Sequence, residues 1–394
     1  NLNYCYFPSS LLGVGNFSIV IIGILIFNSP EYAFNLGLVP ARLENSPVYI
    51  KVGKDVIFVA IILLSFLDIL RKSKIFKLQI YFLILLIYIF ICCIFTADRS
   101  LCVAGIRWII PFILTGAVYP YIDVGFIKKI TRILFVLLIL QVGTQIIELF
   151  VMPPVQGVNS LGLSNRVPGL FYISNTASVF VLFSYFYIRT FEISKRIKKL
   201  GLILTISSLV LMMSSTGVFV FLIMFLFDKS YSSRYFKVLL FFSPIVVFVL
   251  FTNLDLLTGR GEGDTIVSGS TRLSILSECI NETSIISDSF GEATNTAVNL
   301  NLKRAFIADS NIIALYHNLG LIGFMFCFTS FIYLILIAWL KKRKDFILFL
   351  IAYFLCSMPL ILFEIFPSNI IASILLAYFI KNSLYKGHCV NIAK

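Results

Sequence analysis

The sequence is short of charged residues and contains almost no histidine. Only 13% of its 394 residues are Asp, Glu, Lys or Arg, and only 2 are histidine. A soluble domain needs a more polar surface than this composition provides, so the ordinary globular class is excluded. The chain also lacks the pattern G-x-x-x-x-G-K-[ST], which forms a phosphate-binding loop. ATP hydrolysis is therefore not indicated.

A recognisable cysteine framework is missing as well. The chain has 8 cysteines, and none shows CxxC or zinc-site spacing. We expect no metal site, no disulfide framework and no cofactor. Several of the cysteines lie in apolar segments, namely Cys92, Cys93, Cys102, Cys327 and Cys356. The first apolar run, 11–27, lacks a basic n-region and an A-x-A-like cleavage signal, so we expect a retained span there.

Hydrophobic residues are abundant instead. They make up 59% of the chain, the mean hydropathy is +0.98, and Phe (40) and Tyr (18) are frequent, as in helices that face lipid. A span needs roughly 20 apolar residues. We expect an all-α polytopic integral membrane protein, with residues 1–394 forming a single transmembrane domain. The candidate spans are 11–27, 55–70, 78–96, 101–121, 131–151, 170–188, 237–254, 312–340, 345–364 and 367–380, with a further apolar block at 200–227.

Basic clusters predict which ends of the spans are cytoplasmic, because Lys and Arg concentrate on that side. The clusters begin at Arg71, Lys128, Lys195, Lys229 and Lys341. They also carry the excess positive charge of the chain, since the stretch 255–309 is acidic on balance. The net charge of +13 is therefore a topology signal, and we expect no nucleic-acid partner.

The block 200–227 has basic residues on both sides, so it should cross an even number of times. Its polar break at Ser214-Ser215-Thr216-Gly217 predicts two short helices that meet at a turn. A single tilted helix with a re-entrant piece is the alternative. Two crossings give about 12 spans with both termini cytoplasmic. One large loop, 255–311, then lies outside.

This loop holds one candidate cation. Ser270 or Thr271 can cap a helix, which would place Arg272 in its first turn, where a cation opposes the helix dipole. That placement favours an anionic partner for Arg272. An ion pair with Glu278 or Glu282 is the alternative. The glycine-rich start of the loop, 258–264, reads as a linker.

Two more arginines stand out. Arg107 lies inside an apolar run, where a guanidinium faces a cavity or a partner unless it reaches the interface. Arg166 follows Asn165 and precedes Pro168-Gly169, a rigid turn at the outer mouth of the next span. Contact with lipid phosphates is the alternative for Arg166.

His317 is the candidate base. Asp309 or Ser310 could cap the helix that carries it, which puts His317 about two turns inside, near the outer face. A histidine there can accept a proton near neutral pH. A structural hydrogen bond to a neighbouring helix is the alternative.

Four features, taken in their order along the chain, resemble the bacterial O-antigen polymerases (Wzy) and the related O-antigen ligases. They are Asn165-Arg166-Val167-Pro168-Gly169-Leu170-Phe171, the break Ser214-Ser215-Thr216-Gly217, Ser270-Thr271-Arg272, and His317-Asn318-Leu319-Gly320-Leu321-Ile322-Gly323. Many relatives carry a Ser-Arg pair at the break, and this chain lacks that arginine. The motifs cover about 160–330.

The resemblance implies a metal-independent glycosyltransferase that joins undecaprenyl-pyrophosphate-linked oligosaccharide repeat units at the periplasmic face of the inner membrane. Lipopolysaccharide O-antigen is its product, and membrane lipid and a chain-length regulator are the partners to expect. Arg107, Arg166 and Arg272, with Asn165, would bind the pyrophosphate, because arginine forks hold phosphate oxygens and stay charged. His317 would be the base, with Asp309 second and Glu278 third.

Two other functions compete. An O-antigen ligase uses the same donor and transfers the glycan to lipid A-core. A lipid-linked oligosaccharide flippase or another transporter would show an internal repeat and charged residues along a central pathway, and neither is evident in the sequence.

Overall fold

The computed structural model describes most of the predicted helical parts of the chain. The described residues are 48–72, 77–151, 167, 169–171, 174–192, 194–212, 214–227, 274–279, 284–306, 308, 310–365 and 367–384. Within them every regular element is a helix, as the composition predicted. The chain divides into two compact units, the first formed by 1–59 and 124–213 and the second by 60–123 and 214–394. The single transmembrane domain expected for 1–394 stays a prediction.

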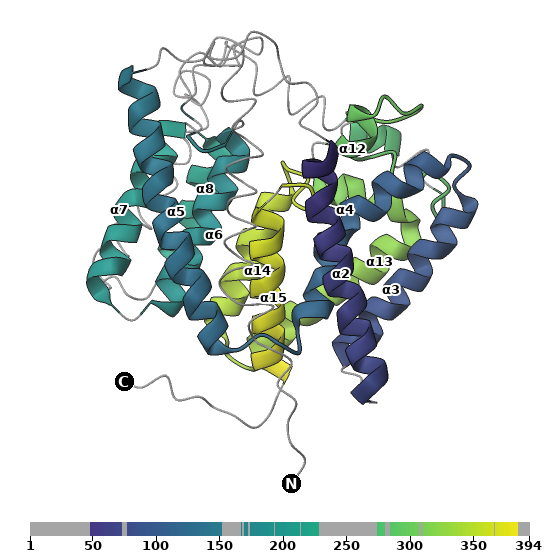
Figure 1. The fold of residues 1–394 in the computed structure, drawn as a ribbon, viewed down its shortest axis with the longest axis horizontal. Helices are drawn as coiled ribbons and strands as arrows, with labels where there is room; N and C mark the ends of the chain where they lie inside the picture. The colour runs from purple at the N-terminus through teal and green to yellow at the C-terminus, as the bar shows by residue number, and fades with distance from the viewer. Residues whose placement is uncertain are drawn as a thin grey trace. The chain divides into compact units, whose positions relative to one another are not determined.

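The first unit contains three helices that pack side by side, α5 (Val124–Val151), α6 (Ser174–Phe191) and α7 (Lys195–Met212) (Figure 1). A buried amide joins two of them. Gln145 Nε2 donates to the carbonyls of Val167 (2.8 Å) and Ser208 (3.3 Å), and its Oε1 accepts from Ser208 Oγ (2.7 Å). Buried polar groups need such partners, and here they fix α5 against α7.

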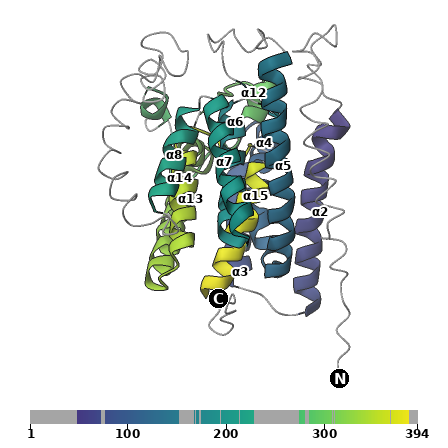
Figure 2. The same ribbon diagram turned by 90° about the vertical axis from the view of Figure 1, so that its left-hand side faces the viewer.

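The second unit is built around α4 (Arg99–Val118). The helix α4 contacts α3 (Lys77–Phe95), α12 (Asn295–Asn299) and α15 (Ser368–Leu384). Asp98 caps α4 by accepting a hydrogen bond from Ser100 N at 2.8 Å. Trp108 and Ile109 on α4 are fully buried. The remaining helices of this unit include α13 (Asn311–Leu340) and α14 (Lys344–Ser357), which lie side by side (Figure 2).

Four helices of the described residues are long and apolar enough to cross a membrane. They are 78–95, 99–118, 124–147 and 311–340, and two shorter apolar helices lie at 55–67 and 216–225. The 55–67 helix is part of α2 (Val48–Lys72). These helices are compatible with a membrane protein. The predicted spans 11–27 and 237–254 lie outside the described residues, so about 12 spans remains a prediction.

The predicted break in 200–227 is confirmed. The helix α7 ends at Met212, and α8 (Ser215–Leu226) begins after Ser214. The Ser214 side chain caps α8 by accepting from Gly217 N at 3.3 Å. The double crossing itself stays a prediction.

The predicted span 345–364 is wrong at its end. The helix α14 stops at Ser357, two residues before Pro359. Met358 keeps helical dihedral angles and still donates to Phe354 O at 3.2 Å, but Pro359 lacks the N–H that would continue the ladder. The chain from 358 to 365 is therefore irregular, and it turns back onto the start of α13, where Asn311 N donates to Leu360 O at 3.0 Å.

Candidate functional site

Residues 284–306 of the predicted large loop, which we call the docked segment, pack onto α4 and α13. Phe290 N donates to Thr96 Oγ1 at 3.2 Å. Gly291 has φ +100°, and a Cβ on it would lie 2.0 Å from Leu101 O. Only glycine tolerates that backbone conformation and that close approach. The segment therefore enters the helix bundle through a turn that fits against the start of α4.

Asn318 on α13 holds this turn in place. Its Oδ1 accepts from Gly291 N and from Ala293 N, both at 3.1 Å, and its Nδ2 donates to Ala293 O at 3.3 Å. Asn318 is fully buried. A buried amide that uses both its donor and its acceptor specifies one arrangement of its neighbours. Glu292, the residue between these two partners, is positioned by this network.

Glu292 pairs with His317. The distance between His317 Nε2 and Glu292 Oε2 is 3.2 Å, and both side chains are buried. A carboxylate can only accept hydrogen bonds. Nε2 therefore carries the hydrogen and donates the hydrogen bond to Glu292 Oε2. In a neutral imidazole, Nδ1 then carries a free lone pair. His317 Nδ1 is buried and has no hydrogen-bond partner in the part of the chain that the structure describes.

The helix that carries His317 is broken by Gly320. Gly320 has φ 67° and ψ −177°, which are not helical values. The N–H groups after the break lose their helical acceptors and bond to the docked segment instead. Leu321 N donates to Ser284 O at 3.3 Å, and Ile322 N donates to Ile285 O at 3.1 Å. The part of α13 that follows the break is thus joined to the docked segment through main-chain hydrogen bonds.

Tyr88 and Ser287 complete the hydrogen bonding at the break. Tyr88 Oη donates to Leu319 O at 2.6 Å and accepts from Gly323 N at 3.2 Å. Ser287 Oγ donates to His317 O at 3.0 Å. A main-chain group buried without a partner costs about 1–3 kcal/mol, so these bonds stabilise the kinked form of α13.

A second carboxylate, Glu364, binds the docked segment from the turn between α14 and α15. It accepts from Asn295 N at 2.7 Å, and from Thr296 N and Thr296 Oγ1 at 3.1 Å each. Burial raises the pKa of Glu364, while these hydrogen bonds and the nearby charge of Arg107 act in the opposite direction. The Arg107 guanidinium therefore lies near Glu364. Glu364 binds the docked segment at Asn295 and Thr296, a short way along the chain from Glu292.

The site thus combines an imidazole, a guanidinium and two carboxylates from α13, α4 and the irregular parts of the chain. Phe306 packs edge-on against His317, with ring centroids 4.9 Å apart, and its N–H donates to Glu292 O at 3.1 Å. A histidine oriented by a carboxylate can take a proton from a hydroxyl group. A nearby arginine can neutralise an anionic leaving group.

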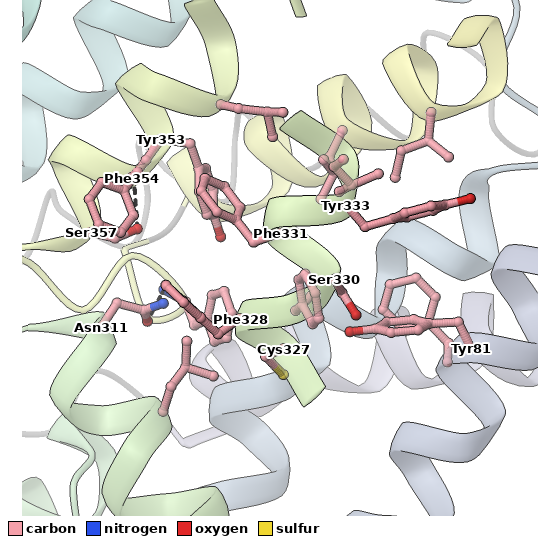
Figure 3. A pocket seen from close by; sticks show the side chains of 18 of the residues that line it. Tyr81, Asn311, Cys327, Phe328, Ser330, Phe331, Tyr333, Tyr353, Phe354 and Ser357 are labelled. Atoms are coloured by element: carbon pink, nitrogen blue, oxygen red, sulfur yellow. Dashed lines mark hydrogen bonds between the residues drawn. The ribbon is translucent and has the colours of Figure 1, made fainter. Parts of the chain in front are cut away.

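An apolar cavity of about 650 Å³ lies in the same unit (Figure 3). Asn311, Phe112 and Phe363 line it, and its few polar groups include Tyr81 and Ser330, whose hydroxyls point toward each other. Phe363 stacks on Phe112 with ring centroids 5.2 Å apart. Because Phe363 directly precedes Glu364, the cavity and the charged site lie next to each other along this turn.

The structure describes two of the predicted site residues, Arg107 and His317, and brings both into this region. The other four, Asn165, Arg166, Arg272 and Asp309, lie outside the described residues. Glu278 is exposed on the helical stretch 274–279, whereas His317 is buried. Ser310 is at the N-cap position of α13, but the predicted capping hydrogen bond from its side chain is wrong. Its hydroxyl donates to Ser357 O at 3.4 Å instead.

Sequence reasoning missed Glu292 and Glu364 as site residues. Neither lies in a motif, and the partners that orient them are distant in the sequence. Glu292 pairs with a residue 25 positions away, and Glu364 with residues 68 and 69 positions away. The local signals were Gly291 directly before Glu292 and the apolar run around Glu364.

Comparison with known proteins adds no relative. No family model matches the chain, and no curated protein matches it significantly. Among the described residues, no group of three or more His, Cys, Asp or Glu side chains is arranged to hold a metal ion.

Proposed function

We propose that the protein is an O-antigen polymerase, a glycosyltransferase of the bacterial inner membrane that joins undecaprenyl-pyrophosphate-linked repeat units at the periplasmic face. The single observation that carries the proposal is the 3.2 Å contact between His317 and Glu292. It leaves one ring nitrogen of a buried histidine available as a base beside the docked segment, and Glu364, which lies near Arg107, binds the same segment.

The proposed reaction has one displacement step. A hydroxyl oxygen of the acceptor unit bonds to the anomeric carbon of the donor glycan, and the bond from that carbon to the pyrophosphate oxygen breaks. The hydroxyl proton passes to His317 Nδ1, and the electron pair of the broken bond leaves with undecaprenyl pyrophosphate. Glu292 stabilises the imidazolium that forms, as carboxylates do beside catalytic histidines.

Arg107 supports the leaving group in this proposal. A guanidinium stays charged and binds phosphate oxygens through a planar fork of donors. In the described state Glu364 lies near Arg107, so the incoming pyrophosphate competes with a carboxylate for this cation. Arg166, Arg272 and Asn165 remain the further proposed ligands, and Asp309 the second base.

The apolar cavity supports the lipid part of the proposal. Its volume of about 650 Å³ is in the range of lipid and cofactor pockets, and its lining is mainly aromatic and aliphatic. An isoprenoid chain in this cavity would place a charged head group near the turn at Phe363 and Glu364. His317 Nδ1 is closed off from solvent in this state, so an acceptor reaches it only after the docked segment moves.

The test is complementation of a polymerase-null strain, scored on lipopolysaccharide gels. The unmodified chain should restore a ladder of O-antigen lengths. His317→Ala, Arg107→Ala, Arg166→Ala and Arg272→Ala should leave lipopolysaccharide capped with a single repeat unit. Full ladders from all four variants would show that the site is wrong. If deletion of the native gene leaves bare core, the protein is a ligase.

A further inference from the structure

Two cysteines face each other at the corner between α3 and α4, which we define as residues 92–102. Cys93 lies in the last turn of α3 and Cys102 in the first turn of α4. Cys102 Sγ donates to Cys93 O at 3.5 Å, so the Cys102 thiol lies against the main chain of Cys93. Cys93 is partly exposed and Cys102 is buried. In this state both thiols are reduced.

The backbone of the corner is held tightly, so the two thiols stay together. Arg99 Nη1 donates to Cys93 O at 2.8 Å, and Thr96 Oγ1 donates to Cys92 O at 2.9 Å. Asp98 caps α4 from the middle of the corner. Only residues 96–98 separate the two helices. A disulfide forms most readily where the two cysteines are already held close together, and this short corner holds the Cys102 thiol 3.5 Å from the carbonyl oxygen of Cys93.

The corner is also where the docked segment binds. Thr96 Oγ1 accepts from Phe290 N at 3.2 Å, and Gly291 fits against Leu101 O. The Cys92 thiol lies beside the main chain of Ser287. The turn that carries Glu292 therefore takes its position from the same corner that holds Cys93 and Cys102.

We propose that Cys93 and Cys102 form a reversible disulfide that fixes this corner and, with it, the turn around Glu292. The two thiols lose two protons and two electrons, and the electrons and protons pass to an oxidant of the disulfide class, which becomes two thiols. A reductant of the thiol class reverses the step. The predicted topology places the corner on the outer side, where disulfide oxidants act. The disulfide regulates the proposed site, but its formation does not depend on the polymerase assignment.

The first experiment asks whether the bond forms. The full chain is purified in detergent, reduced, equilibrated with oxidised glutathione, alkylated and digested with trypsin, which cuts after Arg99 and so separates the two cysteines. Mass spectrometry should find the two peptides joined, and dithiothreitol should release them. Cys92 shares a peptide with Cys93, so Cys92→Ser should keep the link and Cys93→Ser should abolish it. Two unlinked peptides, or a link that survives Cys93→Ser, would overturn the proposal.

The second experiment asks whether the bond acts on the site. Hydrogen exchange is compared between oxidised and reduced unmodified protein, so no variant has to fold. Main-chain exchange over 287–293 should slow at least threefold on oxidation, by an order-of-magnitude expectation, because cross-links suppress local opening. Exchange over α7 in the first unit should not change. Equal rates over 287–293 in both states would overturn the link to Glu292. Neither experiment uses glycan synthesis, so either can succeed where the polymerase test fails.

Discussion

His317 and Glu292 form a buried pair in which the carboxylate fixes the histidine tautomer. The distance between His317 Nε2 and Glu292 Oε2 is 3.2 Å, and Asn318 holds the turn that carries Glu292 through three hydrogen bonds. The orientation of His317 therefore depends on Glu292 and, through the turn that carries Glu292, on Asn318 of the same helix. This series of contacts, from Asn318 to Glu292 to His317, lets the fold specify which ring nitrogen of His317 has no hydrogen-bond partner.

Glu292→Gln should lower the polymerisation rate by about 10- to 100-fold while leaving the protein folded, because the amide keeps a hydrogen bond but loses the charge that stabilises imidazolium. The measurement is chain extension with purified lipid-linked units over a range of pH. The pH dependence of the rate should move, which a purely structural effect would not cause. Glu278→Gln is the matched control, since Glu278 is exposed. A rate and pH profile equal to those of the unmodified protein would remove Glu292 from the mechanism.

Gly320→Ala should destabilise the second unit by about 1–3 kcal/mol or more, because alanine is strained at positive φ. Its Cβ would also lie 2.7 Å from Ser287 N and 2.9 Å from Ile285 O. Thermal unfolding of the purified protein measures this loss. Gly143→Ala is the control, since a Cβ there meets nothing within 4 Å. Equal melting temperatures for the two variants would contradict the described kink.

Tyr88→Phe should cost about 1–3 kcal/mol, because it removes one hydroxyl that serves both Leu319 O and Gly323 N, and buried main-chain groups are costly to leave unpaired. Hydrogen exchange at Gly323 should accelerate, while exchange in α5 should not. Unchanged exchange at Gly323 would mean that another group satisfies its N–H.

Glu364→Gln should flatten the pH dependence of stability. Burial raises the pKa of Glu364 above 4.5, so the folded protein favours the neutral form of this carboxyl. The stabilisation that results is present at low pH, and it is lost as pH rises from 4.5 through the raised value. Melting temperatures measured upward from pH 4.5 should therefore fall less in Glu364→Gln than in the unmodified protein. Glu278→Gln should keep the original slope.

Apolar runs located the described helices because burial in lipid or in a bundle requires long uninterrupted apolar stretches. The end of α14 was misplaced because hydropathy continues past Pro359, whereas the backbone cannot. Arg107 and His317 could be proposed because a charged or titratable group inside an apolar run is unusual.

Glu292 could not be found in the same way, because it lies in an irregular stretch where acidic residues are common. Glu364 does lie in an apolar run, as the one acidic residue from 346 to 394, but its partners could not be read from the sequence. Glu364 is surrounded by residues 295 and 296 and lies near Arg107, and all three are distant from it in the sequence. Three-dimensional neighbours of this kind leave no pattern in a single sequence.

The break at Gly320 has a consequence for how the protein is made. The N–H groups of Leu321 and Ile322 find their acceptors in Ser284 and Ile285, which belong to the stretch that precedes α13. Lipid offers no substitute partner for such groups. Before residues 284–287 lie beside it, α13 is therefore either a straight helix or has N–H groups without partners in the protein, and it reaches its bent form only once they have docked. Formation of the site is thus ordered, because residues 284–287 must dock before the bend at Gly320, three residues after His317, can settle.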